Sequence, residues 1–457
     1  MKFLNPDPTR AYITNQLWLP KGFIRVNFVK SGLEFWSSGQ NAEFVQMWEE
    51  TPTHLIVPRE FAKQHQYADF KFPVVDMTPK NFEHVPFRTN IIPRNQTQRD
   101  SMQAMISNRG GVLNLACGKG KTVIALWLAA QLKVPTIVIV HNTTLVDQWK
   151  ERIREHLDYD GEIGTVQGDK FDWEHPICLA MIHTLAGRAH EMPPQFRHRW
   201  GLTIFDEVHH LAAPWFSRTA PLFYGQRFGL TATPEREDGR ENVFFFHLGP
   251  IIYSDVSQDL VPDIFFMRVP TWLDMQNAQV KEEVLDVTGS IHLSKLRGWL
   301  GRNEERNGII AMHVRNLLKS GRRILALSHS VEHLKTMHEM FPESGLCIGE
   351  VAQDLRFEML QRQLVFATIQ IAAEGLDEPS LDTLMILTPF GSKNWVEQAV
   401  GRIQRRREGK QKPLVVIVED NRVEKVLKVC RTTKKSFRRL GYNYRVVDWA
   451  DRLECTP

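Results

Sequence analysis

A glycine-rich stretch from Leu115 to Thr122 reads Leu-Ala-Cys-Gly-Lys-Gly-Lys-Thr and lies between two segments of contrasting pattern. The apolar run that ends at Leu115 predicts a short buried strand, and residues 122–132 predict a helix. Gly118 and Gly120 allow the backbone to curl so that several N–H groups point at one anion. The order of strand, loop and helix therefore indicates an α/β fold in which the loop and the helix N-terminus hold a phosphate group.

The side chains of this loop fit a nucleoside triphosphate with its metal ion. Lys121 can reach the β- and γ-phosphates, and the Thr122 hydroxyl can hold Mg²⁺. The loop begins with Leu115, where the usual pattern has glycine, so the stretch taken alone is also compatible with a simple glycine-rich turn. The loop residues expected to bind ATP are Cys117, Gly118, Lys119, Gly120, Lys121 and Thr122.

A second motif stands at the end of another short apolar strand. Residues 202–205 read Leu-Thr-Ile-Phe and are followed by Asp206-Glu207-Val208-His209. A carboxylate at such a strand end can bind Mg²⁺, and an adjacent carboxylate can orient and deprotonate a water molecule. We therefore expect Asp206 to be a metal ligand and Glu207 to be the catalytic base. The alternative is a solvent-exposed acidic pair, which the upstream phosphate loop disfavours.

Two further motifs are weak when each is taken alone. Residues 229–234 read Gly-Leu-Thr-Ala-Thr-Pro and could relay hydrogen bonds from a nucleotide site, although most such runs are ordinary loops. Arg402 and Arg405 are three residues apart on a predicted helix, so they share one face. Guanidinium groups in this arrangement could contact phosphate oxygens as arginine fingers. The alternative is a solvated basic helix, because more basic residues follow directly.

In this order, the motifs resemble those of the superfamily 2 helicases and translocases over roughly residues 94–420. Within that superfamily the chain is similar to the XPB-type DNA helicases and to phage branch-migration helicases of the UvsW type. The closer likeness rests on the Leu-x-Cys-Gly-x-Gly-Lys-Thr loop and on the triplet Arg236-Glu237-Asp238 after Thr-Ala-Thr. The Asp-Glu-Val-His motif argues against the Asp-Glu-Ala-Asp RNA helicases.

The resemblance implies roles for residues in both halves of the chain. Gln98 lies where the family has a glutamine that reads adenine, although Gln96 competes for this role. The catalytic residues implied are Lys121, Glu207, Arg402 and Arg405, and further ATP contacts are expected from Gly375, Asp377 and Gln398. Coupling between ATP and nucleic acid is expected from His209, Thr231, Thr233, Arg236, Glu237 and Asp238. Contacts with DNA are expected from Asn142, Thr143, Gln148, Thr184, Ser328 and Thr368.

The fold class implied is α/β, with two RecA-like parallel-sheet motor domains in tandem and a small N-terminal α+β accessory domain. Residues 89–255 are expected to form the ATP-binding motor domain 1, and residues 301–457 motor domain 2 with a basic C-terminal segment. Residues 256–300 are expected to be a connector. Residues 1–88 carry no motor motif, and we interpret them as an accessory domain that binds DNA.

Aromatic side chains are numerous in this N-terminal segment. We expect them to form the core of the small domain, and the alternative is that an exposed ring stacks on an unpaired base at a DNA junction. The residues concerned are Trp18, Phe23, Phe28, Phe35, Trp36 and Trp48.

Composition agrees with a multidomain globular protein. The 457 residues suggest about three domains, with 42% hydrophobic and 24% charged residues. No apolar run is long enough to cross a membrane. The five cysteines are widely spaced, which predicts no structural metal and a reduced cytoplasmic setting, the host cytoplasm if a phage encodes the chain. Basic residues dominate positions 402–445, which predicts either a face that neutralises DNA phosphates or a solvated surface.

The function implied is an ATP-dependent DNA helicase that uses ATP and Mg²⁺ and is favoured to be a monomer. It would unwind forks or Holliday junctions and migrate branches in recombination, replication or repair. The alternative is an ATP-driven double-stranded DNA translocase that remodels protein–DNA complexes without separating strands. A third hypothesis is a junction-binding module whose ATP hydrolysis serves as a timer.

Overall fold

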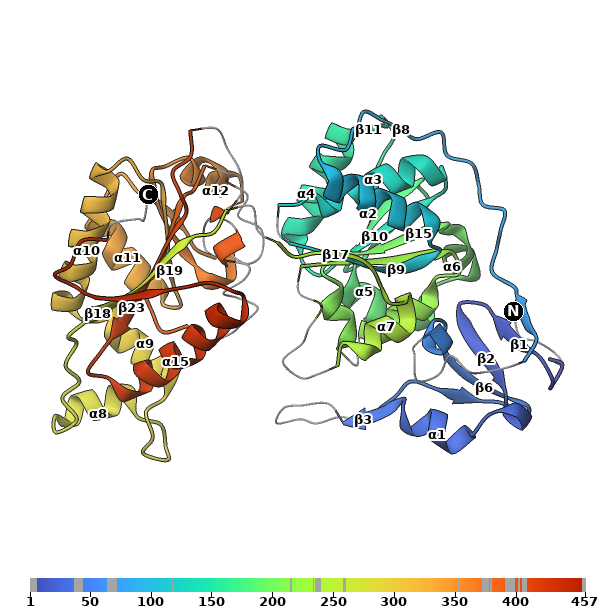
Figure 1. Ribbon diagram of the computed structural model, residues 1–457, viewed down its shortest axis with the longest axis horizontal. Helices are drawn as coiled ribbons and strands as arrows, with labels where there is room; N and C mark the ends of the chain where they lie inside the picture. The colour runs from blue at the N-terminus through green and yellow to red at the C-terminus, as the bar shows by residue number, and fades with distance from the viewer. Residues whose placement is uncertain are drawn as a thin grey trace. The chain divides into compact units, whose positions relative to one another are not determined.

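The structure is a computed structural model, and the chain forms two compact units, Met1–Val256 and Ser257–Pro457 (Figure 1). The residues that the structure describes are 6–36, 44–63, 72–116, 118–213, 216–232, 234, 240–257, 260–349, 351, 353–371, 378, 380–390, 399–401, 403–404 and 409–453.

An eight-stranded sheet lies at the centre of the first unit, in the order β13-β12-β14-β10-β15-β16-β9-β17. Only β13 is antiparallel to its neighbour, β12, and the other neighbours pair in parallel. The strands in chain order are β9 (Gly110–Leu115), β10 (Thr136–Val140), β12 (Gly164–Gln167), β13 (Lys170–Asp172), β14 (Ile177–Met181), β15 (Leu202–Phe205), β16 (Gln226–Thr231) and β17 (Ile251–Asp255).

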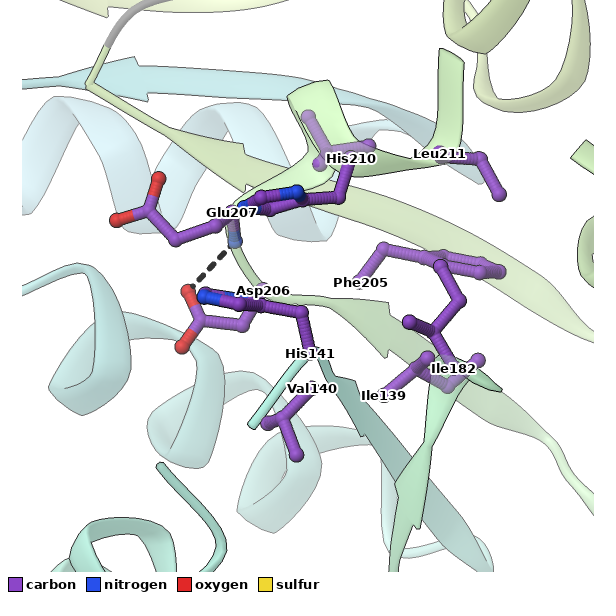
Figure 2. Close-up of a pocket in the computed structure, with 10 residues that line it drawn as sticks. Ile139, Val140, His141, Ile182, Phe205, Asp206, Glu207, His210 and Leu211 are labelled. Atoms are coloured by element: carbon purple, nitrogen blue, oxygen red, sulfur yellow. Dashed lines mark hydrogen bonds between the residues drawn. The ribbon is translucent and has the colours of Figure 1, made fainter. Parts of the chain in front are cut away.

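Helices cover both faces of this sheet because its central strands are apolar on both sides. In β10, Ile137 and Ile139 belong to one core, whereas Val138 and Val140 belong to the other. Ile139 pairs with Phe205 of β15, and Figure 2 shows these two strand ends side by side. One face carries α2 (Gln96–Ser107), α3 (Lys121–Leu132) and α4 (Thr143–His156), and the other carries α5 (Ile182–Gly187), α6 (Pro194–Arg199) and α7 (Asn242–Leu248).

A small N-terminal α+β region packs onto the α7 side of this sheet. Phe61 meets Phe246 of α7 with ring centroids 5.1 Å apart, and one apolar core runs through both regions. Its sheet has the order β5-β6-β2-β1-β7, and β3 pairs separately with β4. Its elements are β1 (Ala11–Ile13), β2 (Gln16–Pro20), η1 (Lys21–Phe23), α1 (Val26–Ser31), β3 (Glu34–Trp36), β4 (Phe44–Gln46), β5 (Glu49–Glu50), β6 (His54–Pro58), η2 (Phe61–Lys63) and β7 (Val74–Asp76).

The expectation that the N-terminal aromatic residues form its core is wrong for three of the six. Phe23 and Phe28 are each 57% exposed and Trp36 is 65% exposed, whereas Phe35 and Trp48 pack partly buried against the core. The sequence pattern could not separate these rings, because Phe23, Phe28 and Trp36 lie in the short elements η1, α1 and β3, whose buried side is set by tertiary contacts.

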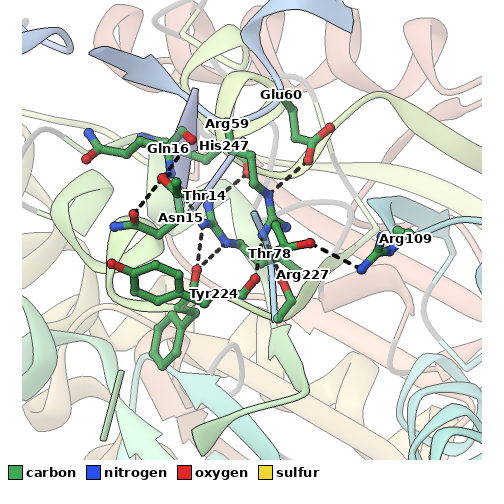
Figure 3. A network of polar contacts seen from close by, with 12 residues as sticks. Thr14, Asn15, Gln16, Arg59, Glu60, Thr78, Arg109, Tyr224, Arg227 and His247 are labelled. Carbon is green, nitrogen blue, oxygen red and sulfur yellow. Dashed lines mark hydrogen bonds and ion pairs between the residues drawn. The ribbon is translucent and has the colours of Figure 1, made fainter. Parts of the chain in front are cut away.

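Buried arginines fasten the N-terminal region to the motor sheet (Figure 3). Arg227, at the start of β16, is fully buried and donates hydrogen bonds to the carbonyl oxygens of Asn15, Phe223 and His247. Arg59 Nη1 donates to two further carbonyl oxygens, at residues 224 and 225, over 3.1 and 2.8 Å. Burial lowers the pKa of both guanidinium groups, so this attachment depends on the carbonyl oxygens that surround them.

The second unit is built on a seven-stranded sheet in the order β20-β21-β19-β22-β23-β18-β24, in which all neighbours pair in parallel. Both units thus have the helix-covered parallel sheet expected for RecA-like domains. The strands are β18 (Asp263–Val269), β19 (Ile324–Ser328), β20 (Gly345–Cys347), β21 (Leu364–Thr368), β22 (Thr383–Ile386), β23 (Leu414–Asp420) and β24 (Arg445–Asp448). The helices are α8 (Ala278–Val284), α9 (Leu293–Arg302), α10 (Glu304–Lys319), α11 (Val331–Glu339), α12 (Gln353–Leu360) and α15 (Glu424–Arg439).

The segment 256–300, expected as a connector, supplies part of this second unit. β18 pairs with β23 on one side and with β24 on the other, and Leu296 and Leu300 of α9 are fully buried in the core. The run Asp-Ile-Phe-Phe-Met-Arg-Val is apolar enough for a strand that is covered on both faces. It carries no motif, which is why motif spacing alone assigned it to a connector.

Replacing Arg227 with methionine should lower the free energy of unfolding by at least about 2 kcal/mol, because each buried carbonyl left without a donor costs about 1–3 kcal/mol. Urea denaturation followed by tryptophan fluorescence measures this change. The matched control is Arg109→Met, which removes a guanidinium that is 57% exposed and paired with Asp76. It should cost less than about 1 kcal/mol. Equal losses in the two variants would contradict a fastening role for Arg227.

Candidate nucleotide and DNA site

The glycine-rich loop has the backbone that its sequence predicts. Gly118 and Gly120 have positive φ angles of 84° and 87°, and α3 begins directly afterwards at Lys121. A Cβ atom at position 120 would lie 2.6 Å from Gln98 Nε2, so only glycine fits there without a shift. Lys121 Nζ donates a 2.9 Å hydrogen bond to the Leu115 carbonyl oxygen, which folds its side chain back over the loop.

Gln98 lies against this loop, whereas Gln96 does not. Gln98 Nε2 donates to the Lys119 carbonyl oxygen over 3.2 Å, and its Oε1 accepts from a backbone N–H over 2.9 Å. Gln96 is exposed and its amide donates to Asp100. Of the two glutamines that the sequence left open, the structure therefore brings Gln98 to the nucleotide loop.

Asp255 is a member of this region that sequence reasoning missed. Asp255 is the last residue of β17. Its carboxylate forms a 2.7 Å ion pair with Lys119 Nζ and accepts a 2.6 Å hydrogen bond from the Thr97 hydroxyl. The pair ties the loop to the edge strand of the sheet. No sequence signal could have found Asp255, since its role depends only on β17 lying next to β9.

The acidic motif follows β15, and Asp206 is held by two hydrogen bonds. Trp149 Nε1 donates to Asp206 Oδ2 over 2.8 Å, and the Glu207 backbone N–H donates to Oδ1 over 3.0 Å. Burial and the adjacent Glu207 charge raise the pKa of Asp206 to about 6, against the lowering effects of Trp149 and Lys121. A hard cation would relieve this crowding of negative charge, so the Asp206 carboxylate is suited to bind a Mg²⁺ ion. Thr122, expected as the second ligand, lies in the first turn of α3.

Glu207 is in the left-handed region, with φ 45°, where a residue other than glycine costs about 1–2 kcal/mol. Its Oε2 lies 3.4 Å from His209 Nδ1, and the same nitrogen lies 3.5 Å from Thr231 Oγ1 at the end of β16. Three residues with predicted catalytic or coupling roles are thus brought together. Strained backbone of this kind is often found at functional positions.

Two histidines line the pocket beside this acidic motif (Figure 2). The rings of His141 and His210 stack with centroids 4.0 Å apart and planes inclined by 28°. Burial lowers the pKa of His141 to about 4, although the nearby Glu207 charge opposes this shift. The His141 ring is therefore neutral at pH 7.

The residues predicted to contact DNA in the first unit follow neighbouring strands. Asn142 accepts a 2.9 Å hydrogen bond from the Leu145 N–H and so caps α4, Thr143 is exposed, and Gln148 is half-buried. Thr184 Oγ1 accepts a 2.9 Å hydrogen bond from the Gly168 N–H. β10 and β14 pair in parallel, so the segments that carry these residues start from one edge of the sheet.

The two residues predicted to contact DNA from the second unit are buried. Ser328 has no exposed surface, and its Oγ accepts from a backbone N–H and lies 3.2 Å from His333 Nδ1. Thr368 is 8% exposed. Both residues end strands, β19 and β21, that have a neighbouring strand on each side.

Some predicted site residues lie outside the described residues, and their roles stay predictions. They are Cys117, Thr233, Arg236, Glu237, Asp238, Gly375, Asp377, Gln398, Arg402 and Arg405. Within the described ranges, no helix has the length and apolar character needed to span a membrane. The same part of the chain contains no cluster of three or more His, Cys, Asp or Glu side chains suited to a metal ion.

Replacing Trp149 with phenylalanine should weaken Mg²⁺-dependent ATP binding roughly tenfold, because a hydrogen bond to a charged group contributes about 1.5–3 kcal/mol and water restores part of it. Titration of a fluorescent ATP analogue with and without Mg²⁺ measures the effect. Trp200→Phe is the control, since the buried Trp200 N–H has no hydrogen-bond partner among the described residues. If Trp149→Phe and the unmodified chain bind equally well, the indole does not position Asp206.

Comparison with known proteins agrees with this geometry. Residues 91–236 match the family described as "Type III restriction enzyme, res subunit". The DNA 3'-5' translocase XPB2 of Sulfurisphaera tokodaii is 27% identical over 70% of this chain and 80% of its own length. A protein of Acanthamoeba polyphaga mimivirus, named provisionally as an ATP-dependent RNA helicase, is 25% identical over 82% of this chain and 71% of its own length. A probable helicase of Escherichia phage T5 is 28% identical over 67% of this chain and 66% of its own length.

Solved structures share the fold. A fragment of an HsdR subunit of a type I restriction enzyme from Vibrio vulnificus superposes with a TM-score of 0.55 at 18% identity, over 79% of this chain and 70% of that one. The S. cerevisiae protein Dbp5 superposes with the same TM-score at 11% identity, over 78% of this chain and 90% of that one. The motif order, the two parallel-sheet units and these relatives together show an ATP-hydrolysing helicase motor that is similar to the XPB-type DNA helicases and to phage helicases.

Proposed function

We propose that the protein is an ATP-dependent DNA helicase that acts on branched DNA, with fork or Holliday-junction unwinding and branch migration as its reaction. The motor assignment rests on one observation above all. The phosphate loop follows β9 and the acidic motif follows β15, and both strands pair in parallel with β16, so the loop and the motif leave the sheet at the same edge. The setting in recombination, replication or repair follows from the family likeness alone.

The residues of the first unit have distinct roles in this proposal. Lys121 and the loop N–H groups bind the β- and γ-phosphates. Thr122 and Asp206 would hold Mg²⁺, which would neutralise charge on the phosphates. Glu207 orients a water molecule toward the γ-phosphorus and accepts its proton. His209 contacts both Glu207 and Thr231, so it is placed to report the state of the nucleotide to the end of β16.

The role of Arg402 and Arg405 as arginine fingers is proposed from the sequence alone. Such groups stabilise the charge on the transferred phosphoryl group.

A basic helix of the second unit supports binding to a nucleic acid backbone. α15 buries Val426, Cys430 and Phe437 in the core and turns most of its cationic side chains outward. Cationic side chains on one exposed face neutralise phosphates without reading the base sequence. The exposed basic residues of this helix are Lys428, Arg431, Lys435, Arg438 and Arg439.

The preference for branched DNA is supported by an exposed aromatic pair in the N-terminal region. Trp36 of β3 and Phe44 of β4 are 65% and 50% exposed, and their ring centroids are 5.5 Å apart. Exposed rings on a soluble domain are suited to stacking on unpaired bases, which occur where strands separate at a junction. Arg240 donates to the Trp36 carbonyl oxygen, so the pair is attached to the motor fold.

A double-stranded DNA translocase that remodels protein–DNA complexes is the second candidate function. It is supported by the relative named as a DNA 3'-5' translocase, which matches 80% of its own length. The two candidates share the ATP chemistry and differ in whether strands are released.

ATP hydrolysis and strand release, measured side by side on forked, four-way, linear and single-stranded DNA and on RNA, test the proposal. We expect the fastest hydrolysis and release of strands on branched DNA. Glu207→Gln should bind ATP and hydrolyse it at least about a hundredfold more slowly, as expected when a general base is lost. Hydrolysis stimulated by linear duplex without strand release would favour the translocase, and an active Glu207→Gln variant would refute the base assignment.

Trp36→Ala should weaken binding to forked DNA by about 1–3 kcal/mol, the contribution of one base stacked on an aromatic ring. Fluorescence anisotropy with a forked and a fully paired DNA of equal length measures the change, and only the fork should be affected. Trp272→Ala is the matched control, because Trp272 is 67% exposed but lies in the second unit. Unchanged fork binding by a folded Trp36→Ala variant would remove the support for junction recognition by this pair.

A further inference from the structure

Two histidine rings join segments that belong to different predicted motifs. His141 directly follows β10, and His210 lies in η5 (Val208–Ala212), the turn of 3-10 helix that follows Glu207. Their ring centroids are 4.0 Å apart and their planes are inclined by only 28°, so the rings overlap face to face (Figure 2). Neither histidine has a role in the ATP chemistry proposed above.

Each ring is also attached to a residue with a proposed role. Asn142 Nδ2 lies 3.1 Å from His141 Nε2, and the Asn142 side chain caps the helix α4. On the other side, the His210 ring lies 4.5 Å from the ring of His209, whose Nδ1 is 3.4 Å from Glu207 Oε2. The described contacts therefore run without a break from the start of α4 to the carboxylate of Glu207.

We propose that His141 and His210 are positioning residues that transmit the binding of a DNA strand at the start of α4 to the orientation of Glu207. The inference rests on the proposed function, since it assumes that Asn142 meets DNA and that Glu207 orients water. A DNA phosphate that accepts a hydrogen bond from the Asn142 amide would compete with the contact between Asn142 and His141, and the His141 ring would then move. Because stacked rings in a packed site move together, η5 would follow.

The backbone conformation of Glu207 makes the direction of its carboxylate depend on the position of η5. Glu207 precedes η5 and is one of two non-glycine residues with positive φ among the described residues. A left-handed residue has a narrow allowed region, so a small displacement of η5 changes where its carboxylate points. Coupling between two sites requires an element that both of them displace, and the histidine stack with η5 is such an element.

Steady-state ATP hydrolysis with and without DNA tests the inference. In His210→Ala the ratio of the DNA-stimulated rate to the basal rate should fall about tenfold, within the range of typical coupling between sites. The basal rate and the affinity for a fluorescent ATP analogue should stay close to those of the unmodified chain. His210→Phe keeps a flat ring in the stack and should restore most of the stimulation.

His198→Ala is the matched control. The His198 ring stacks on Tyr224 with centroids 4.1 Å apart and the same inclination of 28°, but His198 lies in α6 and Tyr224 follows η6 (Phe216–Leu222), so neither belongs to the acidic motif. Its loss removes an equivalent stack in the same unit and should leave the stimulation ratio unchanged.

Each outcome decides the inference. Full stimulation in His210→Ala would overturn it, and so would a loss of basal hydrolysis in proportion to the stimulated rate, because His210 would then only support the local structure. An equal fall of the ratio in His198→Ala would overturn it as well. If the unmodified chain hydrolyses no ATP under any condition, the proposed function itself fails, and that result is separate from the behaviour of the variants.

Discussion

Parallel pairing of buried strands is the constraint on which the candidate site depends. β10 leads to His141 and Asn142, β15 leads to Asp206 and Glu207, and β16 ends at Thr231. Because parallel neighbours end at the same edge of a sheet, residues that are far apart in the sequence meet there without any local signal. The apolar side chains on both faces of these strands pack into the two cores and so hold that edge in place. The same strands therefore form the core and position the residues of the candidate site.

The opposite edge of the same sheet holds the N-terminal region. β16 carries Arg227 near its first residue and Thr231 at its last, and the five residues span about 13 Å. At one end a buried guanidinium binds carbonyl oxygens of the N-terminal region and of the motor fold. At the other end Thr231 meets His209. The N-terminal region is therefore attached to the motor sheet at the first end of β16, and it shares a core with that sheet.

The sequence indicates the motifs of the candidate site more readily than the residues that support them. The loop and the acidic motif were recognisable because their function requires particular residue types at fixed spacing. Trp149 and Asp255 were missed, since a core tryptophan and a strand-end aspartate are common and their partners lie far away in the sequence. The sequence also does not show which of these side chains are buried. Ser328 was expected to face DNA and has no exposed surface, whereas Trp36 was expected in a core and is exposed.

Two buried aspartates differ in whether a neighbouring charge compensates their own. Asp420 has a structural role, and Asp206 belongs to the candidate site. Asp420 accepts two hydrogen bonds from Arg306, at 2.6 and 3.2 Å, and both side chains are fully buried, so the charges compensate each other. Asp206 instead lies beside Glu207, and its pKa rises from 3.8 to about 6. Between those values the unfolded chain ionises first, so the folded state loses stability as the pH rises, and the full penalty is present above about pH 6. A bound cation would reduce this penalty at Asp206, whereas the charge of Asp420 is already compensated by Arg306.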